Sequence, residues 1–297
     1  MKLSIGNTSV INGKVYYGGG YTCDDQCCNI VYCYEPSKDN WTELPPLPVK
    51  WFGLGQVNGK LVAIGGEKDK TSNKVYTYSE QSQKWKYTIQ PIPTARRAPG
   101  VLSLQSALVV AGGKTPPGNY TDIVEIFKPD TLRWYKTDPL PTDCRDVSVV
   151  NIGNTCYVLG GYKHPSRLNQ ALYASVDDLL YNAVPANQTT HSDRNEIQSA
   201  WKSLPNTPTY LPAAAVLAES LFALGGKETW NGEANKKEIY MYSPSTNSWI
   251  YISDLPAPRS HTAVAVLSPT EILVIGGWGD GDRVNTVYKG TLHLNTP

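Results

Sequence analysis

The feature that most restricts the fold of this chain is a pair of adjacent glycines that returns at nearly regular intervals. The pairs are Gly19-Gly20, Gly65-Gly66, Gly112-Gly113, Gly160-Gly161, Gly225-Gly226 and Gly276-Gly277, at intervals of 46, 47, 48, 65 and 51 residues. Each pair after the first follows four mostly apolar residues, such as "LVAI" before Gly65. Self-similarity at a period of about 20–50 residues is typical of repeat proteins, so we expect one structural unit built six times.

A second landmark in most units is an aromatic residue that precedes a tryptophan by seven positions. These pairs are Tyr34 and Trp41, Tyr78 and Trp85, Phe127 and Trp134, and Tyr242 and Trp249. In the fourth unit we take Tyr173 and Trp201 as the equivalents, although they lie 28 positions apart. A proline-containing link follows each tryptophan, for example "LPPLP", and the sixth unit has no such tryptophan.

Composition favours an all-β fold. The 25 Gly and 22 Pro provide many turns, and 19 Tyr and 8 Trp against 3 Phe suit short amphipathic strands. A continuous apolar run before each glycine pair is typical of a strand that is buried on both faces. No helical periodicity stands out along the chain.

Together these motifs resemble the Kelch repeat, in which a hydrophobic strand, Gly-Gly, a spaced Tyr and Trp, and a proline-rich link with Arg follow one another. The segment "PAPRSHTAVAVLSPTEILVIGG" (256–277) is an especially close match, and the resemblance covers nearly all 297 residues. It implies a six-bladed β-propeller with four-stranded blades. We therefore expect a single domain over 1–297, with approximate blades at 6–50, 51–97, 98–145, 146–210, 211–259 and 260–297 and an N-terminal contribution from 1–5.

The sixth unit raises the question of how the ring closes. It ends after "NTVYKGTLHL" (285–294) without a tryptophan-bearing strand, so the last blade is expected to lack its outer strand. Two readings stay open: the natural chain continues upstream, or the sixth blade has three strands. An open outer edge favours pairing with another chain or an oligomer.

The candidate binding residues gather on one face. With strands A to D running from axis to rim and alternating in direction, the D–A links and B–C loops emerge on the same side. Residues just after the glycine pairs, such as Lys114, are therefore expected on this face as well. The candidates there are Lys50, Trp51, Arg97, Arg145, Tyr210, Arg259, Ser260, His261, Tyr21, Tyr162 and Trp278. In Kelch adaptors this face binds short, often acidic peptides, and Arg suits carboxylates because it binds them bidentately. The alternative reading is that these arginines tie the links to neighbouring blades.

The leading functional prediction is a non-catalytic interaction module that binds a protein or peptide partner, as a scaffold or as the recognition domain of a larger adaptor. The alternative is a glycan-binding, sugar-modifying or oxidase propeller of the Kelch-like type. A copper site would need convergent His and Tyr ligands. Of the four histidines, His164, His191, His261 and His293, only His164 and His261 are expected near the mouth. No sialidase-type Ser-Asp-Gly-Trp box is present, so we expect no enzyme, metal or cofactor.

Charge and composition exclude other partners. A net charge of +1 disfavours nucleic acid, and no apolar run is long enough to span a membrane. The N-terminus lacks the apolar core of a secretory signal, so we expect a cytoplasmic protein, with an extracellular one as the alternative. The four N-x-[ST] matches, at Asn7, Asn40, Asn119 and Asn187, are weak evidence for secretion.

Two local features carry weaker expectations. Cys23, Cys27, Cys28 and Cys33 are spaced poorly for zinc, and a disulfide among the first three is favoured only if the protein is extracellular. The extra residues of the fourth unit, within 174–200, are expected to form a solvated insertion opposite the candidate face. "DDLL" (177–180) is expected to start a short helix there.

Overall fold

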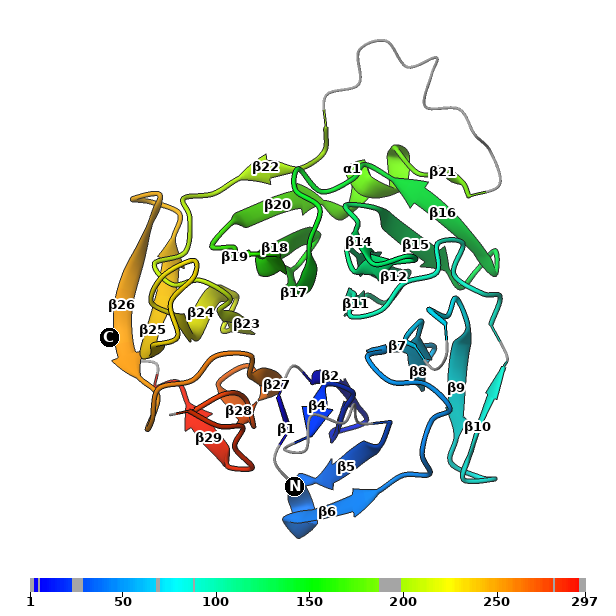
Figure 1. Cartoon of the computed structure of the whole chain (residues 1–297), viewed down its shortest axis with the longest axis horizontal. Coiled ribbons are helices and arrows are strands. Elements are labelled where there is room, and N and C mark those ends of the chain that lie inside the picture. The colour runs from blue at the N-terminus through cyan, green and yellow to red at the C-terminus, as the bar shows by residue number, and fades with distance from the viewer. Residues whose placement is uncertain are drawn as a thin grey trace.

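The computed structural model is a ring of six β-sheets around a central axis (Figure 1). The structure describes residues 3–4, 6–22, 29–67, 70–87, 89–186, 199–279 and 281–293. Each sheet is antiparallel, and strands follow one another from axis to rim in chain order. The predicted all-β, six-bladed propeller is confirmed.

The strands of each blade run as follows. Blade 1 holds β2 (Asn7–Ile11), β3 (Lys14–Gly18), β5 (Val31–Glu35) and β6 (Asn40–Glu43), and blade 2 holds β7 (Gly53–Val57), β8 (Lys60–Ile64), β9 (Val75–Ser79) and β10 (Lys84–Tyr87). Blade 3 holds β11 (Gly100–Ser103), β12 (Leu108–Ala111), β15 (Val124–Lys128) and β16 (Arg133–Thr137), and blade 4 holds β17 (Arg145–Ile152), β18 (Thr155–Lys163), β20 (Ala171–Ser175) and β22 (Lys202–Ser203). Blade 5 holds β23 (Ala213–Leu217), β24 (Ser220–Lys227), β25 (Asn235–Ser243) and β26 (Ser248–Asp254), and blade 6 holds β27 (Ala263–Ser268), β28 (Glu271–Ile275) and β29 (Val287–Thr291).

Shorter elements complete the described chain. They are β1 (Leu3–Ser4), β4 (Tyr21–Thr22), a 3-10 helix η1 (Pro36–Lys38), β13 (Lys114–Thr115), β14 (Asn119–Tyr120), β19 (Ser166–Arg167), α1 (Val176–Tyr181) and β21 (Val184–Pro185). No helix among the described residues has the length and apolarity to cross a membrane.

The core lies between blades, which explains the continuous apolar runs. In β8, Leu61 and Ala63 pack in one cluster with blade 1, while Val62 and Ile64 pack in another with blade 3. Alternate side chains of a strand point to opposite faces. A strand that is covered on both faces therefore needs apolar residues at every position.

The repeated tryptophans join neighbouring blades. In blades 1, 2, 3 and 5, the Trp lies on strand D opposite its predicted aromatic partner, for example Phe127 and Trp134 with ring centroids 5.3 Å apart. In blades 2 to 5, the indole N–H donates to a carbonyl in the link that leaves the preceding blade. The Nε1–O distances are 2.8 Å from Trp85 to Pro45, 2.9 Å from Trp134 to Gln90, 3.0 Å from Trp201 to Asp138 and 2.8 Å from Trp249 to Pro205.

The fourth blade differs from the predicted aromatic pairing. Tyr173 lies opposite Lys202, so it is one residue out of register with Trp201, and Ala174 takes the aromatic position. Tyr173 instead stacks on Tyr157 of β18, with ring centroids 6.4 Å apart. The prediction of Tyr173 as the partner of Trp201 was wrong. The extra residues between them prevent the strand register from being counted along the sequence.

The described part of the insertion packs on blade 3 instead of extending into solvent. β21 pairs with the outer strand β16, and the Thr137 hydroxyl donates to the carbonyl of Leu179, 2.6 Å away. Val176 and Leu179 of α1 are buried, and the predicted helix is confirmed. Asn187 and His191 lie outside the described residues.

The ring closes by face-to-face packing of blades 1 and 6. Val15 and Tyr17 of β3 share an apolar cluster with Ala263 and Leu273 of blade 6. The Thr8 hydroxyl also donates to the carbonyl of Val264, 2.6 Å away. The sixth blade has three strands among the described residues, as predicted.

Candidate interaction face

Backbone bridges place the two predicted sets of residues on one face of the ring. In every blade, the residue after the glycine pair pairs with a residue of the segment that leads into strand A. The bridges are Ser4–Tyr21, Lys50–Glu67, Arg97–Lys114, Arg145–Tyr162, Tyr210–Lys227 and Ser260–Trp278. In the first of these bridges, Ser4 takes the position that a residue of a D–A link takes in the other blades. The sequence did not reveal this equivalence.

Three cations on blades 2 to 4 lie over aromatic rings of this face. Arg97 lies 4.6 Å from the centroid of Trp51, Lys114 lies 5.1 Å from that of Tyr120, and Arg145 lies 4.8 Å from that of Tyr162. Tyr120 and Tyr162 meet edge to face, with centroids 6.2 Å apart. We call these six residues the mouth cluster. A ring held against a cation restricts the cation's side chain and leaves its N–H groups available at the ring edge.

A small cavity lies among these cations. It has a volume of about 100 Å³ and is lined by Trp51, Arg97, Ala98, Lys114 and Arg145. Tyr120 was not among the predicted residues, and Lys114 was recognised only as a residue following a glycine pair. Both stand in the B–C loop of blade 3, where strand parity alone could have indicated them.

Two carboxylates partly neutralise the mouth cluster. Glu67 pairs with Arg97 and Asp146 pairs with Arg145, each at 2.5 Å. Burial raises the pKa of Asp146, and the charge of Arg145 opposes that rise. Lys114 has no carboxylate within ion-pair distance among the described residues. The cluster therefore keeps an excess of positive charge.

The other half of the face is more closed. Lys227 is 1% exposed, and its ammonium donates to the carbonyl of Glu233, 2.6 Å away. Burial lowers the pKa of Lys227. Arg167 pairs with the Glu233 carboxylate at 3.0 Å, which ties the loops of blades 4 and 5 together. Tyr210 and Trp278 are half-buried, and Lys50 is exposed.

Two predicted residues lie beneath the surface. Arg259 is 3% exposed and Ser260 is 1% exposed. The Arg259 guanidinium donates to the carbonyl of Gly276 at 3.1 Å and to the hydroxyl of Tyr288 at 2.8 Å. Arg259 therefore fits the alternative reading, in which an arginine ties a link to the following blade.

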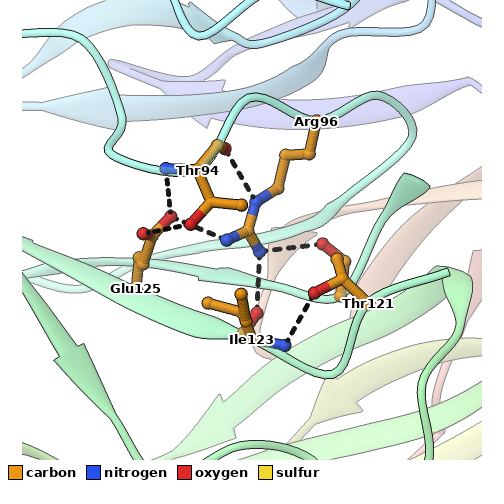
Figure 2. Close-up of polar contacts among 6 residues, drawn as sticks. Thr94, Arg96, Thr121, Ile123 and Glu125 are labelled. Carbon is orange, nitrogen blue, oxygen red and sulfur yellow. Dashed lines mark hydrogen bonds and ion pairs between the residues drawn. The ribbon is translucent and has the colours of Figure 1, made fainter. Parts of the chain in front are cut away.

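Arg96 holds the same position in the link from blade 2 to blade 3, and Figure 2 shows its contacts. Its guanidinium donates to the carbonyls of Gly112 and Ile123, at 2.9 and 2.7 Å, and pairs with Glu125 at 2.7 Å. Both charged side chains are fully buried. Arg96 and Arg259 each stand one residue before a residue that forms a backbone bridge, Arg97 or Ser260. The sequence motif did not distinguish these two adjacent positions.

His261 faces the central axis. It lines a cavity of about 140 Å³ together with residues of the innermost strands, including Asp146 and Ala263. The Ser260 hydroxyl lies 3.0 Å from its Nδ1. Burial lowers the pKa of His261 to about 3, and the cations Lys227, Arg167 and Arg145 act in the same direction.

This pKa predicts an acid-dependent loss of stability. Below about pH 6.5 the unfolded chain protonates this histidine while the folded protein does not, until the pH approaches 3. Stability should therefore fall through this window, and His261→Asn should make the fall less steep. Asn suits the left-handed backbone at this position, where φ is +53°. Urea unfolding of both proteins between pH 4 and 7 measures the difference, and parallel curves would contradict it.

The cysteines and the possible metal ligands are the remaining candidates for a chemical site. Cys33, Cys144 and Cys156 are free and buried, whereas Cys23, Cys27 and Cys28 lie outside the described residues. Within the described part of the chain, no three His, Cys, Asp or Glu side chains gather as a metal site would require.

Six blades, paired glycines and interblade tryptophans define a Kelch-repeat β-propeller. A family model for the Kelch motif matches residues 7–48. Kelch-like protein 25 of Xenopus tropicalis is 25% identical over 253 residues, which are 82% of this chain and 39% of that protein. Kelch-like protein 40 of Xenopus laevis is 24% identical over 214 residues, 70% of this chain and 33% of that protein. Together with the fold, these matches support a relationship of this chain to Kelch-repeat proteins.

The solved structure of YjhT shares the fold. It has a TM-score of 0.76 and 16% sequence identity, and the alignment covers 99% of this chain and 96% of that one. By contrast, the matched region spans only about a third to two-fifths of the length of the two Kelch-like proteins.

Proposed function

We propose that the chain is a non-catalytic interaction module whose mouth cluster binds an acidic segment of a protein partner. The observation that carries this proposal is the set of three cations on neighbouring blades, each held over an aromatic ring around one cavity. Rigid aromatics and arginines are the residues that most often dominate binding energy at protein interfaces. The similarity to Kelch-like proteins supports the same class of function.

The proposed contacts extend around the mouth from this cluster. Lys50, Tyr210 and Trp278 lie at equivalent positions on the other blades and remain half-buried or exposed. His261 lies deeper, at the axis, while Arg259 and Ser260 support the links from below. The three buried free thiols suit a reducing compartment, so we place this activity in the cytoplasm, where the chain would serve as a scaffold or within an adaptor.

A comparison of bound partners tests the proposal. A triple variant carries Arg97→Ala, Lys114→Ala and Arg145→Ala. It should capture less partner than wild type by a factor of about ten or more, because losing one buried charged contact in a complex costs about 2–5 kcal/mol. Affinity capture from a cell extract, quantified by mass spectrometry, measures this loss. Since Arg259 is buried, it is left intact so that the variant keeps its fold.

The matched control removes the same charge from the opposite face. Lys60→Ala, Lys84→Ala and Arg133→Ala change three exposed cations beside the A–B and C–D turns. This variant should keep the wild-type partners. Equal partner lists for wild type and the mouth triple variant, with both folded by circular dichroism, would refute the acidic-segment proposal.

A glycan ligand is the second candidate. Trp230 is 46% exposed on the B–C loop of blade 5, where a flat ring is available for stacking. Its carbonyl accepts a hydrogen bond from the backbone N–H of Arg167, 2.9 Å away, so the loop is held in place. Screening against immobilised glycans distinguishes the two candidates: Trp230→Ala should abolish glycan binding, whereas the mouth triple variant should retain it.

A further inference from the structure

Two tyrosines and a lysine form a polar cluster on the outer strands of blade 2. Tyr87 ends the rim strand β10 and lies opposite Tyr76 of β9 (Figure 1). Their ring centroids are 4.7 Å apart, and the Tyr87 hydroxyl donates to the hydroxyl oxygen of Tyr76, 3.2 Å away. The ammonium of Lys74, just before β9, donates to the Tyr87 oxygen at 3.0 Å. One phenolic oxygen therefore has a cation and a second hydroxyl within hydrogen-bond distance.

The phenol of Tyr87 is open to solvent, whereas its neighbour is not. Tyr87 is 58% exposed and Tyr76 is 4% exposed, and Lys74 is exposed. A donor of an electrophilic group can therefore approach the Tyr87 oxygen while the inner hydroxyl and the ammonium stay beside it. None of the three residues belongs to the mouth cluster, so this cluster is separate from the proposed partner site.

The surroundings of Tyr87 favour its phenolate form. When Tyr87 loses its proton, the hydroxyl of Tyr76 can donate to the phenolate, and the ammonium of Lys74 supplies the opposite charge. The hydrogen bonds of Tyr76 and Lys74 lower the pKa of Tyr87, and these two are the titratable groups that act on it. Burial raises the pKa of Tyr76, so the inner residue keeps its proton. A phenolate attacks electrophiles more readily than a neutral phenol does.

Blade 5 places a tyrosine at the same strand position with the opposite electrostatics. Tyr251 lies two residues after the tryptophan of β26, as Tyr87 does after that of β10. It pairs across the strands with Tyr240, at 6.1 Å between ring centroids, and is 54% exposed. Here burial and the charge of Asp254 raise the pKa of Tyr251. The two tyrosines thus match in position and exposure but differ in local charge.

We propose that Tyr87 is a modification site that accepts acyl groups from activated acyl donors. The phenolic proton passes to solvent, and the phenolate oxygen then adds to the carbonyl carbon of the donor. The bond from that carbon to the leaving group breaks, and the leaving group departs with the electron pair. The product is a tyrosine ester, so the step needs no oxidant or reductant. Lys74 keeps its proton throughout, and Lys74 and Tyr76 stabilise the attacking oxygen.

N-acetylimidazole provides the acyl donor for the test. The 297-residue protein is treated with this reagent, and acetylation is followed by mass spectrometry of tryptic peptides. The peptide 87–96, "YTIQPIPTAR", contains no tyrosine besides Tyr87. Tyr87 should react at least about threefold faster than Tyr251. It should also react faster than Tyr181, although Tyr181 is 82% exposed and exposure alone predicts the reverse order.

Substitutions of Lys74 separate its charge from its packing. Lys74→Gln should slow acetylation of Tyr87 about fivefold, the factor expected for one unit charge a few ångströms away in water. Its rate should also rise only at higher pH, because the phenolate is less stable without the ammonium. Lys74→Arg should keep most of the wild-type rate. Tyr251 in the same samples reports any change in folding, since its rate should stay constant.

Two further readouts complete the test. Tyr76→Phe, which removes the second hydroxyl, should slow acetylation of Tyr87 about threefold or more. Hydroxylamine should remove the acetyl group from Tyr87, because it cleaves tyrosine esters and leaves lysine amides intact. This treatment distinguishes acetylation at Tyr87 from direct acetylation of Lys74.

Three results would overturn the proposal. The first is equal acetylation rates at Tyr87 and Tyr251, and the second is an unchanged rate and pH profile in Lys74→Gln. The third is equal slowing by Lys74→Gln and Lys74→Arg, which would show that Lys74 acts through packing instead of charge.

Discussion

Replacing Glu125 with leucine is expected to lower the free energy of unfolding by about 3–5 kcal/mol, because it leaves the buried Arg96 guanidinium without its counter-charge. The two side chains are fully buried and 2.7 Å apart, and Thr94 donates its hydroxyl to the same carboxylate at 2.8 Å (Figure 2). Burial lowers the pKa of Arg96, and Glu125 is the largest influence that opposes this. Urea unfolding followed by tryptophan fluorescence measures the loss.

An exposed ion pair provides the matched control. Glu271 and Lys289 are 2.7 Å apart with side chains 34% and 58% exposed, so Glu271→Leu should cost no more than about 1 kcal/mol. An Arg96→Met, Glu125→Leu double variant should recover part of the stability, since it removes both charges. If Glu125→Leu costs no more than Glu271→Leu, the buried pair does not contribute as argued.

The sequence predicted the ring because its signals repeat. A single "LVAI" before a glycine pair is ambiguous, but six pairs and five tryptophans in register restrict the chain to one architecture. Strand parity then placed the D–A links and B–C loops on one face, and the backbone bridges confirm that placement. These features follow from local pattern and topology alone.

The details of the site could not be predicted to the same precision. Arg97 and Arg259 looked equivalent in the motif, yet Arg259 corresponds to the buried Arg96, one residue earlier in the link. A shift of one residue in an extended link moves a side chain from the surface to the interior. The docking of α1 and β21 on blade 3 likewise depends on contacts between segments that no repeat relates.

Adjacent residues of a link have different roles in this structure. Arg96 and Arg259 use their donors on the following blade, so they fix the height of the links above the glycine pairs. The next residue in each link, Arg97 or Ser260, then forms a backbone bridge with the residue that follows a glycine pair. A change in Arg96 should therefore affect both stability and partner binding, whereas a change in Arg97 should affect binding alone.

Substitution of the paired glycines is expected to destabilise the propeller. Gly65 has φ +67°, and a Cβ at this position would lie 2.2 Å from the carbonyl oxygen of Arg96. That oxygen also accepts the N–H of Gly66, 2.9 Å away. Gly65→Ala should cost about 1–2 kcal/mol for the left-handed backbone. It should cost about 1–3 kcal/mol more for pushing the link away.

Gly59→Ala separates these two costs. Gly59 has φ +71°, but a Cβ there would meet no atom within 4 Å. It should therefore show only the backbone cost of about 1–2 kcal/mol, and urea unfolding of both variants measures the difference. Equal losses would mean that unusual dihedrals alone explain why strand B ends on two glycines. A larger loss for Gly65→Ala would show that close approach of the next link is the additional reason.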